Sequence, residues 1–209
     1  MELNNLPILK IKVNDDETGI DQISFVEDPA MMEEWKLFKE SKKQDFSYEQ
    51  DEQIIYYPVI VADTPIYRNV PFEHFVVFTK DEIKMMRNRF FKTNKHHDFN
   101  ENHGPIKIDS AYIVESWIKE DEMDKSVKMG FNVPVNSWFV GIKIEDEEYW
   151  NEKVKTGKFT GLSMEAFYDL DIDDDTILEN YTKTLLSMNL KDDVLSEVLR
   201  NIIENFEKS

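Results

Sequence analysis

Short hydrophobic runs along most of the chain follow the two-residue period of β-strands or are continuous, as in a strand buried on both faces. The run that starts at Ile20 ends before Asp28-Pro29, because proline has no backbone N–H to donate and keeps the preceding residue extended. The stretch from Glu40 to Gln53 is polar without a hydrophobic period, which indicates a loop or linker. The predicted strands cover residues 7–13, 20–26, 54–61, 75–78, 111–119, 138–144 and the segment around 161–166.

Helical spacing of hydrophobic residues predicts a long helix inside this strand-rich region, a short helix later, and two helices at the C-terminus. Thr79 can cap the long helix, which continues to Thr93 with acidic residues early and basic residues late, as the helix dipole favours. Asp146 can cap the short helix, and Gly157 suits an exit in the left-handed conformation. The C-terminal helices are predicted over residues 176–188 and 192–206.

Together these elements predict an α+β protein with a β-rich core flanked by helices. The chain has 209 residues, of which 41% are hydrophobic and 12% aromatic, and this is sufficient for a hydrophobic core. We expect N-terminal strands and a polar linker in residues 1–53, the core in 54–170, and an acidic linker with a helical appendage in 171–209.

The composition excludes several classes of function. A net charge of −18 argues against direct nucleic-acid binding, which depends on clustered Lys and Arg. The absence of Cys excludes disulfides, a thiol nucleophile and a cysteine-based zinc site. The N-terminus lacks the basic and hydrophobic regions of a signal peptide, and no apolar run approaches the ~18 residues that span a bilayer. We therefore expect a soluble protein that does not associate with membranes.

Ser163 lies in the segment with the clearest candidate chemistry, Gly161-Leu162-Ser163-Met164-Glu165-Ala166. Alternation along a strand places the apolar side chains of this segment on one face, and Ser163 and Glu165 on the other. The apolar face should contact the core, which directs the Ser163 hydroxyl outward, as a nucleophile requires. The alternative is an ordinary strand serine that faces solvent.

A nucleophilic serine needs a general base, and the chain has four histidines: His74, His96, His97 and His103. His103 lies in the polar corner before a predicted strand and is the best-supported base, whereas His74 is interpreted as structural. A metal-dependent hydrolase that uses His96, His97 and His103 is an alternative. We expect no metal site, because adjacent histidines diverge and no Cys completes a zinc set.

Six motifs follow one another along the chain: residues 19–30 (GIDQISFVEDPA), 65–68 (PIYR), 100–103 (NENH), 114–118 (VESWI), 138–143 (WFVGIK) and 161–165 (GLSME). Their order, over roughly residues 8 to 168, resembles that in XkdF-like phage proteins. XkdF-like proteins resemble prohead maturation proteases, related to the prohead proteases of tailed phages and to herpesvirus assemblin. The chain departs from the family pattern at Ala166, where glycine is usual. The extra methyl is tolerated unless the backbone there needs positive φ or lies against substrate.

This resemblance implies a serine protease without a cofactor, on an assemblin-like β-barrel flanked by helices. By position, Ser163 would be the nucleophile and His103 the general base. Assemblin uses a second histidine after the serine, and this chain has none there. A carboxylate is the physical substitute, because an anion that accepts the other ring N–H orients the histidine. The expected carboxylate is Glu115, and its rivals are Glu165 and Asp98.

The resemblance also implies a biological setting. The protein would cleave scaffold protein and the precursors of major capsid or portal proteins, inside an assembling procapsid in the host cytoplasm. It would act alone or as a homo-oligomer, and retention in the virion is compatible with this setting. The alternative is a catalytically silent virion protein of the same fold, kept for its structural contacts.

Overall fold

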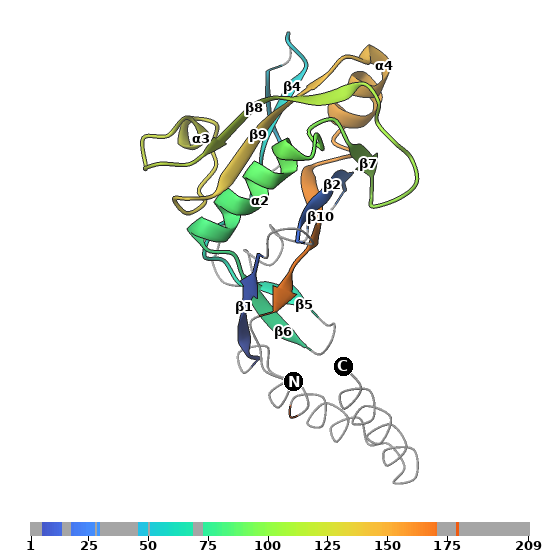
Figure 1. The fold of residues 1–209 in the computed structure, drawn as a ribbon. Helices are drawn as coiled ribbons and strands as arrows, with labels where there is room; N and C mark the ends of the chain where they lie inside the picture. Colours follow the sequence, from blue (N-terminus) through green and yellow to red (C-terminus); the bar gives the residue numbers. More distant parts are fainter. Residues whose placement is uncertain are drawn as a thin grey trace.

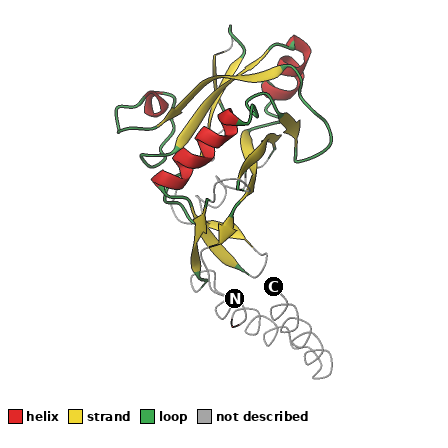
Figure 2. Ribbon diagram, in the orientation of Figure 1, coloured by secondary structure: helices red, strands yellow, loops and turns green. Residues whose placement is uncertain are grey.

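The computed structural model describes residues 6–13, 18–27, 29, 46–49, 51–68, 73–170 and 179. This part of the chain is mostly β-sheet with a few helices, which confirms the α+β class (Figure 1, Figure 2). The predicted C-terminal helices lie outside the described residues, apart from position 179. None of the described helices has the length and hydrophobicity needed to span a membrane.

A four-stranded antiparallel sheet forms one side of the core. Its strands, in spatial order, are β3 (Ser47–Glu49), β4 (Ile54–Ile60), β9 (Trp138–Ile144) and β8 (Ala111–Ile118). β4 is buried along its full length, which explains its continuous hydrophobic run. Pro58 lies at a register shift between β4 and β9, where a strand tolerates the missing N–H.

Two smaller sheets contain the N-terminal strands. β2 (Gly19–Val26) is the central strand of one sheet, antiparallel to β10 (Gly161–Phe167) and parallel to β7 (Phe99–Glu101). The other sheet has the order β11 (Asp169–Leu170), β1 (Ile8–Lys12), β6 (His74–Val77) and β5 (Ile66–Arg68). The N-terminal region, predicted as residues 1–53, therefore supplies strands to sheets that residues 54–170 complete.

α2 (Lys80–Lys92) confirms the predicted long helix. Thr79 is its N-cap, in a capping box with Glu82, and a stripe of buried hydrophobic residues faces the core. The helix contacts β2, and the ring of Phe90 packs edge-on against Trp138 of β9, with ring centroids 5.7 Å apart. α2 therefore joins the large sheet to the sheet that contains β2.

Three shorter helical segments lie after β8. They are α3 (Lys125–Lys128), α4 (Glu147–Tyr149) and the π-helical turn η2 (Trp150–Val154). Asp146 caps α4 as predicted, with its side chain accepting from the backbone N–H of Tyr149 at 3.0 Å. Gly157 has φ +71°, the left-handed conformation that its sequence position indicated.

The closed β-barrel expected from the family resemblance is not formed by the described strands. In a barrel each strand is paired on both sides. Among the described residues, β10 pairs only with β2, and β8 pairs only with β9. The described core is three separate sheets packed around one hydrophobic cluster.

Candidate active site

Ser163 on β10 lies in a row of polar side chains that crosses three strands. Ser163 is directly opposite Ser24 of β2, and Ser24 is in turn opposite Asn100 of β7. Two residues further along the ladder, Glu165 is opposite Gln22. Directly opposite residues share a face of the sheet, with Cβ atoms about 4.5–5.5 Å apart in an antiparallel pair. Five polar side chains are thereby gathered on one face of the β10–β2–β7 sheet.

The opposite face of β10 is hydrophobic, as the alternation predicted. Leu162 is part of the buried core, and Met164 and Ala166 pack partly buried against it. Ala166 is not among the described residues with positive φ, so its backbone does not require the glycine that is usual in the family. The Ser163 side chain is half-buried, and its hydroxyl forms no hydrogen bond with any described residue.

His103 is held over this face by a tight turn after β7. Both Asn102 and His103 have positive φ, 49° and 56°, and the N–H of Gly104 donates to the carbonyl of Glu101 at 2.8 Å. Positive φ at both central residues is the signature of a type I′ turn, and Asn and His tolerate it better than most other non-glycine residues. The Asn102 N–H donates to the Phe25 carbonyl of β2 at 2.9 Å, which fixes the turn to the central strand.

The imidazole of His103 meets the polar row through its Nδ1 atom. Nδ1 lies 3.0 Å from Ser24 Oγ and 3.1 Å from Glu165 Oε1. An ionised carboxylate only accepts hydrogen bonds, so the contact with Glu165 requires a proton on Nδ1. The neutral imidazole then has its lone pair on Nε2, on the other side of the ring, which is the arrangement of a general base.

Glu115, the carboxylate expected from the sequence, does not contact His103. It lies on β8 in the large sheet, where it pairs with Lys125. Burial first, and then the Glu115 charge, raise the pKa of Tyr56 on β4 to about 12. Asp98, the second rival, lies 3.6 Å from Lys95 and has no contact with His103 either. The carboxylate beside His103 is Glu165, because β10 and β7 are both neighbours of β2.

The remaining histidines are dispersed over other environments. His74 is buried in β6, which agrees with a structural role. His96 stacks on Phe91, with ring centroids 5.9 Å apart, and the His97 ring lies edge-on to it. In the described part of the chain, no group of three side chains of the metal-binding types is arranged to hold an ion.

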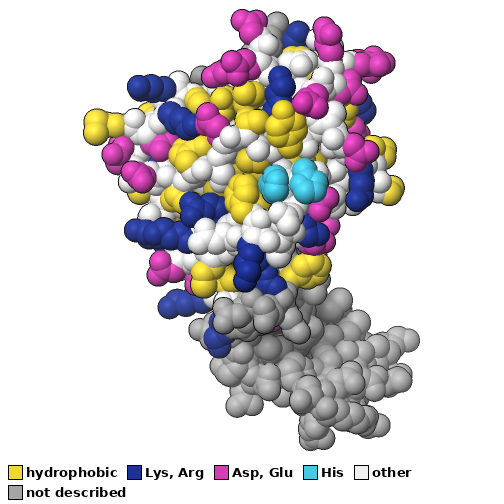
Figure 3. All heavy atoms as spheres, turned by 45° about the horizontal axis from the view of Figure 1, so that its top comes forward, with side chains coloured by type: hydrophobic (Ala, Val, Ile, Leu, Met, Phe, Trp, Pro, Cys, Tyr) yellow, Lys and Arg dark blue, Asp and Glu magenta, His cyan; other side chains and the backbone are white. Residues whose placement is uncertain are grey.

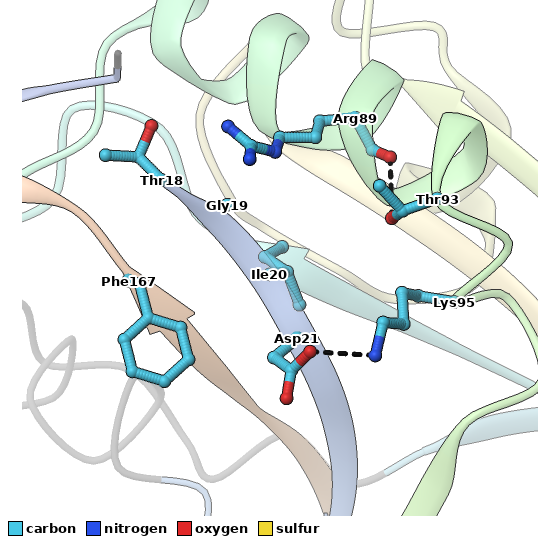
Figure 4. A pocket seen from close by; sticks show the side chains of 8 residues that line it. All are labelled: Thr18, Gly19, Ile20, Asp21, Arg89, Thr93, Lys95 and Phe167. Carbon is cyan, nitrogen blue, oxygen red and sulfur yellow. Dashed lines mark hydrogen bonds and ion pairs between the residues drawn. The ribbon is translucent and has the colours of Figure 1, made fainter. Parts of the chain in front are cut away.

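A pocket of about 140 Å³ opens at the Gly19 end of the β2–β10 ladder, four residues from Ser163 along β10 (Figure 4). In Figure 4, Arg89 extends over Gly19, and Lys95 reaches Asp21, 2.8 Å from its carboxylate. The hydrogen bond with Asp21 raises the pKa of Lys95. The Lys95 ammonium also lies 3.6 Å from the Asp98 carboxylate. On the face of the molecule shown in Figure 3, acidic and basic side chains are interspersed.

Ser24 and Asn100 lie in the family motifs, but the sequence alone indicates no role for them. Ser24 lies in a predicted strand and Asn100 at the start of the polar corner, and the structure buries both, with exposed fractions of 0% and 3%. For Ser24, a polar residue inside a hydrophobic run is the available signal. The sequence gives no indication that β2 lies between β10 and β7, which is what brings the two residues together.

A serine, a histidine and a carboxylate gathered on one sheet face are the groups used by serine hydrolases. Residues 42–171, more than half of the chain, match the family described as putative phage serine protease XkdF, and the chain belongs to that family. The match confirms the family that the ordered motifs indicated. No curated protein and no solved structure matches the chain.

Proposed function

We propose that this protein is a serine endopeptidase that cleaves scaffold protein and virion-protein pro-segments during phage head assembly. The observation that carries the catalytic part is the contact between Glu165 Oε1 and His103 Nδ1, at 3.1 Å, on the face that bears Ser163. Family membership supports the protease class. The head-assembly role, inside a procapsid in the host cytoplasm, rests on the resemblance to prohead proteases of tailed phages and to assemblin.

The proposed reaction is acyl transfer from a peptide to Ser163 and then to water. Ser163 Oγ attacks the scissile carbonyl while His103 Nε2 accepts the hydroxyl proton, and His103 then returns that proton to the leaving amine. Glu165 holds the proton on Nδ1 and stabilises the imidazolium formed during attack. Water releases the acyl group, with His103 again acting as base.

The direct test is co-expression of the protein with its scaffold or capsid precursor. We expect defined cleavage products from the native chain and intact precursor from Ser163→Ala or His103→Gln. Ser110→Ala is a matched control, because Ser110 lies in the turn before β8, outside the polar row, and should leave cleavage unchanged. Cleavage by Ser163→Ala at the native rate would overturn the proposal.

A catalytically silent virion protein is the second candidate, and one observation favours it. Ser163 Oγ forms no hydrogen bond with His103 in the structure. Catalytic hydrogen bonds are often long without substrate and tighten in the complex, so an active protease can also lack this bond before substrate binds. A serine-directed phosphonate separates them, because it labels Ser163 in an active protease and leaves a silent protein unmodified.

A further inference from the structure

The Asn100 side chain has one orientation that its neighbours permit. Its amide group faces Glu165 Oε1 at 3.2 Å and Gln22 Oε1 at 3.0 Å, and its other end contacts Ser24 Oγ. A carboxylate only accepts hydrogen bonds, so the atom that faces Glu165 must be the Nδ2 donor. The Asn100 carbonyl oxygen therefore faces Ser24.

This orientation sets the direction of every other hydrogen bond in the row. A carbonyl oxygen only accepts, and Asn100 Oδ1 lies nearer to Ser24 Oγ than Glu165 Oε1 does, which is 3.4 Å away, so the single hydroxyl proton of Ser24 is donated to Asn100 Oδ1. Ser24 Oγ then offers a lone pair to His103 Nδ1, at 3.0 Å. Nδ1 is thus surrounded by two acceptors, Ser24 Oγ and Glu165 Oε1, and both contacts require its proton.

Burial makes this arrangement costly to change. Ser24 is 0% exposed and Asn100 is 3% exposed, so water cannot replace a lost partner. The outer members are accessible, with exposed fractions of 40% for the His103 side chain and 37% for that of Glu165. Without Asn100, the Glu165 carboxylate would lose a buried donor and gain freedom to turn toward solvent.

We propose that Asn100 and Ser24 are positioning residues that hold Glu165 against His103 and keep His103 in the tautomer with its proton on Nδ1 and its lone pair on Nε2. The assignment deepens the proposed function and rests on it for its catalytic consequence. Neither residue touches substrate in this scheme, because both are buried, whereas the side chains of His103 and Glu165 are partly exposed.

The tautomer is measured directly by NMR on the full chain with ¹⁵N-labelled histidine, under conditions in which the imidazole is neutral. His103→Gln identifies the resonances among those of the four histidines. We expect a single Nδ1-protonated form in the native chain, and a mixture with the Nε2-protonated form in Asn100→Ala. A native His103 that is protonated on Nε2 would overturn the proposal without any variant.

Asn100→Asp guards against a simple loss of folding, because it keeps the volume of the side chain and replaces only the donor group. It places a carboxylate against Glu165, so we again expect the tautomer mixture, with a backbone amide spectrum like that of the native chain. Asn88→Ala, on the exposed side of α2, is the matched control and should leave the tautomer unchanged. An unchanged Nδ1-protonated form in folded Asn100→Asp would contradict the assignment.

A double-mutant cycle tests the catalytic consequence. We expect Asn100→Ala to lower kcat about 10-fold with KM within about twofold, because positioning acts on the transition state. In a Glu165→Ala background, the same substitution should cost less than about twofold, because its target is absent. If the losses in kcat of the two single variants multiply in the double variant, Asn100 acts independently of Glu165 and has a purely structural role.

The two measurements separate failure of this inference from failure of the proposed function. Suppose that hydrolysis depends on Ser163 and Glu165 and that the His103 tautomer is unchanged in Asn100→Ala. This result refutes only the positioning role. Absence of Ser163-dependent hydrolysis, together with a tautomer that shifts in Asn100→Ala, refutes the protease and leaves the hydrogen-bond network in place.

Discussion

Glu165 and Glu115 are both strand carboxylates, and they differ in the cation or donor that each one meets. Glu165 accepts from His103 and Asn100 on the face of Ser163, whereas Glu115 pairs with Lys125 on another sheet. Which carboxylate can serve the proposed site is a matter of contact, because an anion orients an imidazole only within hydrogen-bonding distance.

Replacing each carboxylate by its amide tests this difference. We expect Glu165→Gln to lower kcat about 100-fold or more, because a neutral amide can stabilise the wrong tautomer and cannot stabilise the imidazolium. Glu115→Gln should remain within about twofold of the native rate, since surface ion pairs contribute little. Initial rates of precursor cleavage check both values. Equal losses in the two variants would show that Glu165 has no special relation to His103.

Gly161 is a second residue whose identity the site depends on. A Cβ there would lie 2.6 Å from Pro29 Cγ and 2.6 Å from the Tyr57 hydroxyl oxygen, so β10 approaches its neighbours more closely than any side chain permits. Gly157 is the contrasting position, with φ +71° and no atom within 4 Å of an added Cβ.

Alanine substitutions at the two glycines should therefore differ in their effect on activity. Gly161→Ala should destabilise the fold by about 1–3 kcal/mol and lower cleavage per folded molecule, because the strand that carries Ser163 must shift. Gly157→Ala should cost about 1–2 kcal/mol of backbone strain and leave cleavage per folded molecule unchanged. Urea unfolding gives the stability. The initial cleavage rate, divided by the active-site concentration from titration, gives the rate per molecule. Normal activity of folded Gly161→Ala would contradict the close approach.

At the scale of elements, the sequence predicted what lies on each strand better than which strands are neighbours. Alternation assigned Ser163 and Glu165 to one face, and the capping residue and spacing defined α2. The choice between Glu115 and Glu165 depended on strand order, which is set by pairings distant in sequence. β2 separates β10 from β7, and no local period encodes that placement. The turn at His103 was also visible in part, because Asn-His-Gly favours left-handed backbone.

The burial of Tyr56 on β4 predicts a loss of stability at high pH. The pKa of Tyr56 is raised to about 12 by burial and by Glu115, while an unfolded tyrosine titrates near 10. Between these values the unfolded state releases a proton that the folded state keeps, so stability is full below about pH 10 and falls as pH rises toward 12. The pKa of Tyr149 is raised as well, by burial and then by Glu101, and adds to the fall.

Urea unfolding at a series of alkaline pH values checks this expectation. Tyr56→Phe should reduce the fall in unfolding free energy between about pH 10 and 12, leaving the part that belongs to the other tyrosines with a raised pKa, Tyr112 and Tyr149. Tyr48→Phe on β3 is the matched control, because Tyr48 is 48% exposed, and it should leave the fall unchanged. An identical pH profile in Tyr56→Phe and the native chain would contradict the burial argument.

For the whole molecule, the segment that matches the family is smaller than the unit that the sheets define. Residues 42–171 contain Ser163, His103 and Glu165, but they lack β1 and β2. β2 is the central strand of the candidate site: it supplies Ser24 and Gln22, and it is the only described strand that pairs with β10. Without it, β10 and β7 have no shared partner, and the hydrophobic residues of β2 leave the core.

The fragment 42–171 should therefore fail to unfold cooperatively and should show no precursor cleavage, although it contains all three proposed catalytic residues. The full chain, unfolded by urea under the same conditions, is the reference. Adding a synthetic peptide of residues 6–29 should restore part of the cooperative transition, since β1 and β2 can pair with β6, β7 and β10 from outside the fragment. The same peptide with Ser24→Ala should restore folding better than activity, because the strand is retained and the hydroxyl that meets His103 is lost. A fragment 42–171 that is stable and active by itself would show that the site forms without the N-terminal strands.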